Sequence, residues 1–266
     1  MISKIKKLIE FFPYYLEVFA KKLSGRGIMD PEKNGEFIVL EKIIKNAKKK
    51  VCFFDGGANL GKHTLKFLSL CETYQKEYEL YAVEPFPNTY KKLVESIKYK
   101  NNKILNISLG NKKEKVKFYF NSEETSGSNS TIPHHYLNNV IEVNQDTIDN
   151  IIKEFKIDKI DFLKLDIEGS ELNALDGAKD ALKLNLINYI QLEYNGTWIN
   201  GGGSLRKVYD LCALYDYQLF IITKKHLLSI PSYHLLLDDF YFSNLLLIKK
   251  NLDKLLPVKR KAMPYI

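Results

Sequence analysis

The chain has 266 residues, of which 45% are hydrophobic and 27% are charged, as in a typical folded globular protein. With 14 glycines, 8 prolines and 3 cysteines, the composition excludes a disordered chain, a collagen-like chain and a disulfide-rich scaffold. Because one domain takes about 150 residues, the length predicts one large domain or two small ones. The chain contains no stretch of about 18 apolar residues, so no transmembrane helix is predicted.

The formal net charge is +8, from 40 lysines and arginines against 32 acidic residues. Only Arg26, Arg206 and Arg260 are arginines, the residue type favoured for bidentate contacts to phosphates and bases. The lysine runs are scattered along the chain rather than gathered in one segment. We therefore interpret the charge as a solvated surface and expect no nucleic-acid partner, with an anionic substrate or a membrane surface as alternatives.

Cysteine usage and the first residues indicate a cytoplasmic location. Cys52, Cys71 and Cys212 are odd in number and far apart, and no C-x-x-C pair is present. A cysteine zinc site is therefore not predicted, and a reducing compartment is favoured. Two glutamates and Pro13 interrupt the apolar stretch that an N-terminal secretion signal needs.

Residues 1–33 are predicted to form an amphipathic helical extension before the main domain. Apolar side chains recur at helical spacing over residues 2–23, and Pro13 is expected to kink or restart the helix. One interpretation packs this helix on the domain or at a subunit interface. In the second case the protein would be a homo-oligomer. The other places it on an anionic membrane surface as a peripheral contact.

Residues 34–250 alternate between short apolar strands and helices, which predicts one α/β domain with helices on both faces of a mostly parallel sheet. Seven strands are expected, six parallel and the last antiparallel: Val51–Asp55, Leu80–Glu84, Ile104–Leu109, Ile160–Asp166, Leu186–Glu193, Tyr217–Thr223 and Phe240–Leu247. The expected helices are Leu60–Leu70, Thr89–Ile97, Thr147–Lys156, Ser170–Leu184 and Ser204–Tyr215. A further strand pair is expected at Val116–Phe120 and Val140–Val143, and a basic tail over residues 251–266.

A glycine-rich turn, DGGANLG at residues 55–61, follows the first predicted strand. Glycines let the backbone approach a ligand closely, and the helix N-terminus that follows offers free N–H groups. The turn departs from the dinucleotide pattern G-x-G-x-x-G because Ala58 occupies its third place, and Asp55 would repel a pyrophosphate. The same carboxylate suits the ammonium group of S-adenosylmethionine. Glu84, at the end of the second strand, can accept the ribose hydroxyls of either cofactor.

These motifs resemble those of FkbM-type methyltransferases, a branch of the class I S-adenosylmethionine-dependent enzymes. The matching segments are DGGANLG at 55–61, EPFP at 84–87, FLKLDIEGSE at 162–171, LDGA at 175–178, QLEYN at 191–195 and the preceding NGE at 34–36. They occur in the family's order between residues 34 and 250. The departure is Gly56, where the family usually has valine or isoleucine.

The resemblance implies a Rossmann-like class I methyltransferase fold, S-adenosyl-L-methionine as the cofactor, and O-methylation of a small-molecule hydroxyl. The expected acceptor is a carbohydrate, such as a nucleotide sugar or a surface-glycan unit. The expected cofactor-binding residues are Asp55, Gly57, Asn59, Gly61, Glu84, Pro85 and Ser108. The loops at 121–139 and 195–204 fall outside the motifs, and we expect them to define the acceptor.

Asp166 and Glu193 are the main catalytic candidates, because each ends a strand at the edge where open α/β sheets bind ligands. Together they supply a general base and a neighbour that tunes its pKa. Alternatively, they hold a divalent metal with the amide oxygen of Asn195, or act only as structural caps. Glu168, at the start of the next helix, is a third catalytic candidate, whereas Glu171 is interpreted as a helix cap.

Four further side chains have alternative roles. His134 and His135 follow the long polar loop and are alternative bases. Trp198 either stacks on a sugar or a nucleotide base, or packs against the domain edge. Lys164 is expected to pair with an acid in the sheet.

Other functions compete with sugar O-methylation. An RNA 2′-O-methyltransferase would need a lysine-rich catalytic set, whereas the residues after Glu193 are Tyr194 and Asn195. A nicotinamide-dependent oxidoreductase is disfavoured by Asp55 and by the missing middle glycine of the turn. A binding module without catalysis is disfavoured by the intact turn and by the acids at the strand ends.

Overall fold

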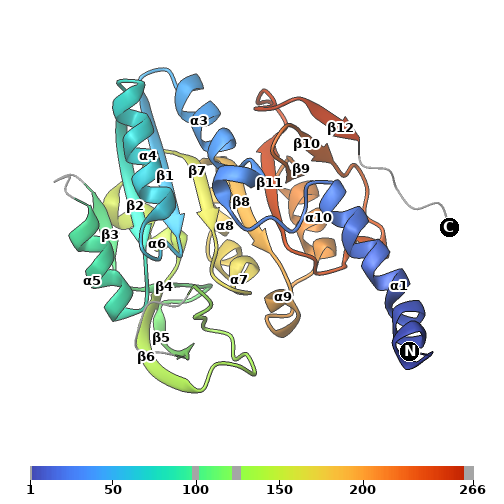
Figure 1. Cartoon of the computed structure of the whole chain (residues 1–266). Coiled ribbons are helices and arrows are strands. Elements are labelled where there is room, and N and C mark those ends of the chain that lie inside the picture. The colour runs from blue at the N-terminus through green and yellow to red at the C-terminus, as the bar shows by residue number, and fades with distance from the viewer. Residues whose placement is uncertain (1, 98–101, 122–126, 261–266) are drawn as a thin grey trace.

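The computed structural model of the chain describes residues 2–97, 102–121 and 127–260, with side chains from residue 11 onward. Figure 1 shows a large central sheet between helices, with a small second sheet near one end of it. The helices are α1 (Ile2–Leu23), α2 (Pro31–Asn34), α3 (Glu36–Asn46), α4 (Lys62–Thr73), α5 (Pro87–Ser96), α6 (Ile148–Phe155), α7 (Glu171–Asp176), α8 (Lys179–Lys183), α9 (Thr197–Asn200), α10 (Leu205–Leu214) and the 3₁₀ helix η1 (Leu235–Leu237).

The large sheet has the strand order β12-β10-β9-β11-β8-β7-β1-β2-β3, and the small sheet has the order β4-β6-β5. The strands of the large sheet are β1 (Lys50–Gly56), β2 (Glu77–Val83), β3 (Lys103–Leu105), β7 (Ile160–Leu165), β8 (Ile187–Tyr194), β9 (Tyr217–Ile222), β10 (Leu227–Ser229), β11 (Ser243–Lys249) and β12 (Val258–Arg260). Those of the small sheet are β4 (Ser108–Leu109), β5 (Glu114–Phe120) and β6 (Asn139–Asp146).

The seven strands from β9 to β3 confirm the predicted mostly parallel sheet. Strands β1, β2, β3, β7 and β8 pair in parallel, and β11 runs antiparallel between β8 and β9. β9 therefore has the same direction as β8, so β11 is the one reversed strand of these seven, as expected. The short strands β10 and β12 extend the sheet beyond β9, which makes it two strands wider than predicted.

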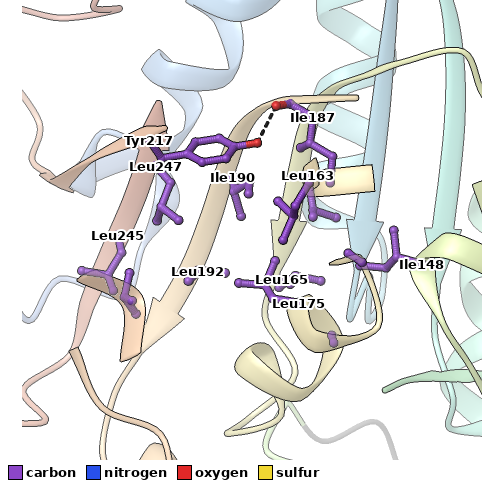
Figure 2. Packing of buried hydrophobic residues seen from close by; sticks show 14 of the residues in the cluster. Ile148, Leu163, Leu165, Leu175, Ile187, Ile190, Leu192, Tyr217, Leu245 and Leu247 are labelled. Atoms are coloured by element: carbon purple, nitrogen blue, oxygen red, sulfur yellow. Dashed lines mark hydrogen bonds between the residues drawn. The ribbon is translucent and has the colours of Figure 1, made fainter. Parts of the chain in front are cut away.

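Side chains alternate along each strand and so feed two separate cores. On one face, Phe53 of β1 and Phe162 of β7 pack with residues of α3, α4 and α5. On the other face, Leu163 of β7 packs with residues of α6, α7, α8 and α10. Figure 2 shows this second core, in which the hydroxyl of Tyr217 donates a hydrogen bond to the carbonyl of Ile187 at 2.6 Å. The polar end of this buried tyrosine is thereby satisfied.

The helix predicted over residues 170–184 is wrong in its extent, because the structure divides it into α7 and α8. At the break, the carbonyl of Gly177 accepts a hydrogen bond from the N–H of Asp149 at 3.0 Å. The carboxylate of Asp149 accepts from the N–H groups of Asp180 and Ala181, each at 2.9 Å, and so caps the start of α8. A residue of α6 therefore fixes the break.

The strand predicted over residues 104–109 is also divided. Its first part is β3 of the large sheet, and its last part is β4, which pairs with β6 in the small sheet. Between them, the side chain of Asn106 donates hydrogen bonds to the carbonyls of Glu84 and Pro85 at 2.9 and 3.0 Å. The segment after β3 can therefore leave the large sheet, because the side chain of Asn106 supplies the hydrogen bonds that the carbonyls of Glu84 and Pro85 would otherwise lack. In the small sheet β5 and β6 form the expected antiparallel pair.

Helix α1 contains Pro13 within a single helical segment and projects from the body of the molecule (Figure 1). Its exposed aromatic side chains are Phe11, Phe12, Tyr14, Tyr15 and Phe19, each between 49% and 61% accessible. Within the described residues, no helix is both long and apolar enough to span a membrane.

The last part of the chain joins the edge of the large sheet. Val258–Arg260 forms β12 and pairs with β10, and Leu255 is buried. Residues 261–266 of the expected tail lie outside the described residues.

Candidate active site

Three residues with left-handed backbone conformations shape the turn after β1. Gly57, Asn59 and Gly61 have φ angles of +78°, +50° and +84°, a region that glycine and asparagine adopt more readily than most residues. At Gly57 a β-carbon would lie 1.9 Å from the carbonyl oxygen of Asp166, so only glycine fits. The turn thus packs directly against the end of β7.

Gly56 differs from the valine or isoleucine expected there, and its neighbours explain the difference. A β-carbon at this position would lie 2.7 Å from the side chain of Leu109 and 2.8 Å from that of Leu165. These two leucines fill the space that a larger residue would take. The glycine at position 56, in place of the family's valine or isoleucine, is therefore explained by how the side chains beneath the turn pack.

Glu84 follows β2 and is anchored by the backbone. Its two carboxylate oxygens accept hydrogen bonds from the N–H groups of Asn59 at 3.0 Å and Phe86 at 2.9 Å. Only 7% of Glu84 is exposed, and burial raises its pKa to about 7, against the lowering effect of the two N–H groups. Each oxygen keeps a second lone pair, so the carboxylate can accept further hydrogen bonds from a diol.

A pocket of about 620 Å³, its open mouth included, lies beside this turn at the carboxyl ends of β1, β2 and β7. Open α/β sheets bind ligands at such a position. The expected site residues that line it are Gly57, Asn59, Glu84, Pro85, Ser108, Asp166 and Glu168. Phe118 of the small sheet and Asn129 of the following loop also contribute to its wall.

Asp55 and Gly61 do not line the pocket. Asp55 is fully buried, and one of its carboxylate oxygens accepts a hydrogen bond from the hydroxyl of Thr64 at 2.7 Å. The other oxygen lies 3.9 Å from the ammonium nitrogen of Lys164. The expected direct contact between Asp55 and a cofactor therefore does not match its position. Gly61 instead starts α4 and packs against Leu93.

Lys164 is a buried cation beneath the pocket, with only 2% of its surface exposed. Its Nζ donates a hydrogen bond to the carboxylate of Asp166 at 2.9 Å, which confirms the expected pairing with an acid. The strand register places Asp55, Lys164 and Gln191 side by side on β1, β7 and β8. Burial lowers the pKa of Lys164, but Asp166 and Asp55 raise it above its usual value, so the side chain stays charged.

Three carboxylates converge next to this cation. Asp166, Glu168 and Glu193 each place an oxygen within 4.8 Å of the other two. Burial raises the pKa of Asp166, but Lys164 more than offsets this and holds it below its usual value. Burial and the charge of Asp166 raise the pKa of Glu168 to about 7 and that of Glu193 well above its usual range. At neutral pH, Asp166 is thus ionised and Glu168 in mid-titration, and the proton of Glu193 is held more tightly than that of an ordinary glutamate.

The structure changes the oxygen set expected for a metal. The amide oxygen of Asn195 already accepts hydrogen bonds from the N–H and the hydroxyl of Thr197, at 2.7 and 2.6 Å. Its Nδ2 donates to the carboxylate of Glu193 at 2.9 Å. With its oxygen engaged in this way, Asn195 is not part of the group of oxygens that lie close together, and Glu168 offers the third oxygen. Hard cations prefer such oxygens, so the three carboxylates are the group that could hold one.

Glu171 shapes the turn that carries Glu168. Its carboxylate accepts hydrogen bonds from the N–H groups of Ile167 at 2.9 Å and Gly169 at 3.0 Å, which precede α7, so Glu171 fixes the turn and not the free N–H groups of the helix. Burial raises the pKa of Glu171 to about 8. Glu168 itself has a φ of +52°, an uncommon conformation for glutamate, and the capped turn holds it there.

Two candidates from the loops have structural roles. Nε2 of His134 donates to the carbonyl of Glu168 at 3.2 Å, and its Nδ1 accepts from the amide of Asn200 at 2.9 Å. Burial lowers the pKa of His134, so the ring is neutral, with both nitrogens engaged and none free to act as a base. Trp198 is 1% exposed and its indole N–H donates to the carbonyl of Glu193 at 2.8 Å. Its interpretation as a stacking surface is therefore wrong.

Glu36 is a site residue to which the sequence analysis gave no role. Its buried carboxylate accepts hydrogen bonds from the amides of Asn244 at 2.9 Å and Gln191 at 2.5 Å, and pairs with His63 at 3.1 Å. The charge of Glu36 contributes to the raised pKa of Lys164. The signal that could have found it is the NGE segment at 34–36, which precedes the first strand.

The family model described as the methyltransferase FkbM domain matches residues 55–219, more than half of the chain. The chain belongs to the FkbM methyltransferase family. A relative of this FkbM protein is the hexuronic acid methyltransferase AglP of Haloferax volcanii, which is 23% identical over 161 residues. The match covers 60% of this chain and 62% of AglP, so the chain spans about three fifths of that relative's length.

Solved methyltransferase structures are similar to this FkbM protein at low sequence identity. The precorrin-6y C5,15-methyltransferase of Geobacter metallireducens has a TM-score of 0.43 and 11% identity, covering 84% of this chain and 92% of that one. A SAM-dependent methyltransferase of Agrobacterium tumefaciens has a TM-score of 0.45 and 8% identity, covering 84% and 63%. The sheet itself, with its reversed strand β11 inserted between β8 and β9, has the expected class I Rossmann-like methyltransferase fold.

The pocket of this FkbM methyltransferase suits S-adenosylmethionine, the cofactor that the family implies. Glu84 offers two anchored carboxylate oxygens for ribose hydroxyls. Oδ1 of Asn59 is buried without a hydrogen-bond partner among the described residues, as expected for an atom that a ligand pairs. The described lining residues include carboxylates but neither lysine nor arginine, which favours a cationic sulfonium group.

Replacing Lys164 with methionine tests the buried charge pair. The variant leaves Asp55 fully buried and Asp166 half-buried without their cation, and breaking a buried pair typically lowers the free energy of unfolding by about 3–5 kcal/mol. Urea unfolding at neutral pH should show this loss. The difference from wild type should shrink as the pH falls, because the unpaired carboxylates can then be protonated. Lys159→Met, at an exposed lysine, is the control and should shift stability by less than about 0.5 kcal/mol. A Lys164 variant as stable as wild type would contradict the pairing.

Proposed function

We propose that this FkbM protein is an S-adenosylmethionine-dependent O-methyltransferase that acts on a carbohydrate hydroxyl. The observation that carries the proposal is that Asp166 and Glu168 line the same pocket as Asn59 and Glu84, called the donor pocket below. An alkyl hydroxyl is a poor acid, and this arrangement puts carboxylates beside the donor site to take its proton. The similarity to AglP, named a hexuronic acid methyltransferase, supports a sugar acceptor.

Glu168 is the best-placed general base of the three carboxylates. Asp166 is hydrogen-bonded to Lys164, which lowers its pKa and so weakens it as a base. Glu193 does not line the donor pocket, and Nδ2 of Asn195 already donates a hydrogen bond to its carboxylate. Glu168 lines the pocket with a pKa of about 7, close to the value at which a general base works best at neutral pH.

The proposed transfer needs the acceptor oxygen, the methyl carbon and the sulfur in one line. Bound S-adenosylmethionine supplies a methyl group that is already electrophilic because it is attached to a sulfonium. The acceptor oxygen forms a bond to that carbon, its hydroxyl proton passes to the carboxylate of Glu168, and the electron pair of the broken carbon–sulfur bond remains on sulfur. Asp166, fixed by Lys164, keeps a negative charge beside the proton that moves.

Replacing Glu168 with glutamine tests the base. We expect kcat to fall about 100-fold or more, as is typical for the loss of a general base, while S-adenosylhomocysteine still binds in calorimetry. In the wild type at saturating substrates, kcat should rise with pH through about 7, because the carboxylate must be deprotonated to accept a proton.

Glu142→Gln, at an exposed glutamate of β6, is the matched control and should keep normal kinetics. If Glu168→Gln retained most of its turnover while Asp166→Asn abolished it, Asp166 would be the base instead.

RNA as the acceptor and a dinucleotide as the cofactor suit the carboxylates around the donor pocket less well than a sugar hydroxyl and S-adenosylmethionine do. Both carry phosphates, and Glu84, Asp166 and Glu168 would repel them. No lysine or arginine among the described lining residues is present to offset that charge. These charges support the small-molecule hydroxyl over RNA 2′-O-methylation and over nicotinamide chemistry.

The pH dependence of donor binding tests Glu84. Ribose hydroxyls donate hydrogen bonds to the ionised form of the Glu84 carboxylate. Because the pKa of Glu84 is about 7, the carboxyl group must lose a proton when the ligand binds below that pH. The affinity for S-adenosylhomocysteine, measured by calorimetry, should therefore weaken as the pH falls below about 7, by up to about tenfold per pH unit. The Glu84→Gln variant should bind S-adenosylhomocysteine more weakly at all pH values. Its affinity should not show the fall with decreasing pH that comes from protonation of Glu84. An unchanged slope in that variant would rule out Glu84 as its source.

We also propose that α1 contacts an anionic membrane surface. Its exposed aromatic side chains, led by Phe12 and Phe19, suit the interface between lipid headgroups and acyl chains. In the sequence they follow Lys4, Lys6 and Lys7, and the whole chain carries a charge of +8, which complements anionic lipids.

Vesicle co-sedimentation tests this contact. The protein should bind vesicles that contain phosphatidylserine more strongly than vesicles of phosphatidylcholine alone, and salt should weaken the binding. The double variant Phe12→Ser and Phe19→Ser should bind less, whereas Tyr119→Ser, on the small sheet, should not reduce binding. If vesicles are not bound and the double variant instead converts an oligomer to a monomer in light scattering, α1 is a subunit interface.

A further inference from the structure

A short segment of the loop between β5 and β6 forms one wall of the donor pocket. Ser130 pairs with Tyr119 through two backbone hydrogen bonds of 2.7 and 3.1 Å, and its hydroxyl donates to the carbonyl of Glu168 at 2.8 Å. The hydroxyl of Thr131 shares a hydrogen bond of 2.6 Å with that of Ser170. The segment is therefore fixed between the small sheet and the turn after β7.

Asn129, the residue before this anchor, lines the donor pocket with unpaired polar atoms. Its Oδ1 and Nδ2 are both shielded from solvent, and neither has a hydrogen-bond partner among the described residues. Buried polar groups in native proteins are nearly always paired, because an unpaired one costs stability. A bound ligand with both a donor and an acceptor would pair both atoms at once.

The pairing of Ser130 with Tyr119 fixes the side on which Asn129 lies. Side chains alternate along paired strands, so Asn129 falls on the opposite side from Ser130, the side that Phe118 shares. Both Asn129 and Phe118 line the donor pocket, which agrees with this placement.

That side of the pocket also carries aromatic side chains close to Glu84. Phe118 belongs to a small apolar cluster with Phe86, whose N–H anchors the carboxylate of Glu84. Glu84, Phe118 and Asn129 line one pocket, so the base of a ribose held by Glu84 has an apolar ring and a carboxamide within the same enclosure.

We propose that Asn129 hydrogen-bonds the edge of the adenine base of S-adenosylmethionine. A carboxamide presents one donor and one acceptor side by side, and adenine presents the complementary pair, as in the recognition of adenine by asparagine in nucleic acids. The inference rests on the proposed donor site. It assigns the segment 127–131 to the donor, although the sequence analysis expected the whole loop to define the acceptor.

The test is a binding cycle with two ligands, S-adenosylhomocysteine and its analogue in which unsubstituted purine replaces adenine. Asn129→Leu keeps the size of the side chain and removes both hydrogen-bonding groups. We expect the variant to bind S-adenosylhomocysteine about tenfold more weakly in calorimetry, the effect of losing one or two neutral hydrogen bonds. Wild type should prefer adenine over purine, and the variant should bind both ligands within about twofold.

Asn138→Leu, at an exposed asparagine of the same loop, is the matched control and should keep the wild-type preference. Asn129→Asp, which keeps the acceptor and the shape but loses the donor, should also bind more weakly. A melting curve of each variant, with a midpoint close to that of the wild type, is the check that it is folded. An Asn129→Leu variant that retains the full preference for adenine overturns this inference alone. A wild-type protein that binds neither ligand overturns the proposed donor site itself.

Discussion

The buried ammonium group of Lys164 is the interaction on which the catalytic end of the sheet depends. Along one face of the sheet, apolar residues such as Phe53 and Phe162 give way to Asp55, Lys164 and Asp166 as the strands approach their carboxyl ends. Carboxylates at this depth are tolerated because a cation lies between them. The sheet can therefore present charge at its edge without losing the apolar core beneath.

The same cation separates the properties of the three converging carboxylates. Lys164 contacts Asp166 and keeps it ionised, whereas burial, together with that fixed charge, raises the pKa of Glu168 and Glu193. Two carboxyl groups with pKa values pushed apart by their surroundings are what acid–base chemistry at neutral pH requires. The difference arises from position alone, because all three side chains carry the same functional group.

Much of the fold and part of the site could be predicted from the sequence, because both follow from local pattern. Strand ends place Glu84 and Asp166 at one edge of the sheet, and the glycine turn precedes its helix as expected. Contacts between distant segments could not be predicted in this way. They bury Asp55 beside Lys164 and divide the helix after β7.

At Gly56, residues from three strands compete for the same small space in the core. The side chains of Leu109 of β4 and Leu165 of β7 occupy the space that a side chain at position 56 would need. The sizes of the residues at positions 56, 109 and 165 are therefore coupled. A larger side chain at position 56 calls for a smaller one at 109 or 165. The effects of substitutions at the three positions on stability should therefore not be additive, because each depends on the volume that the other two side chains occupy.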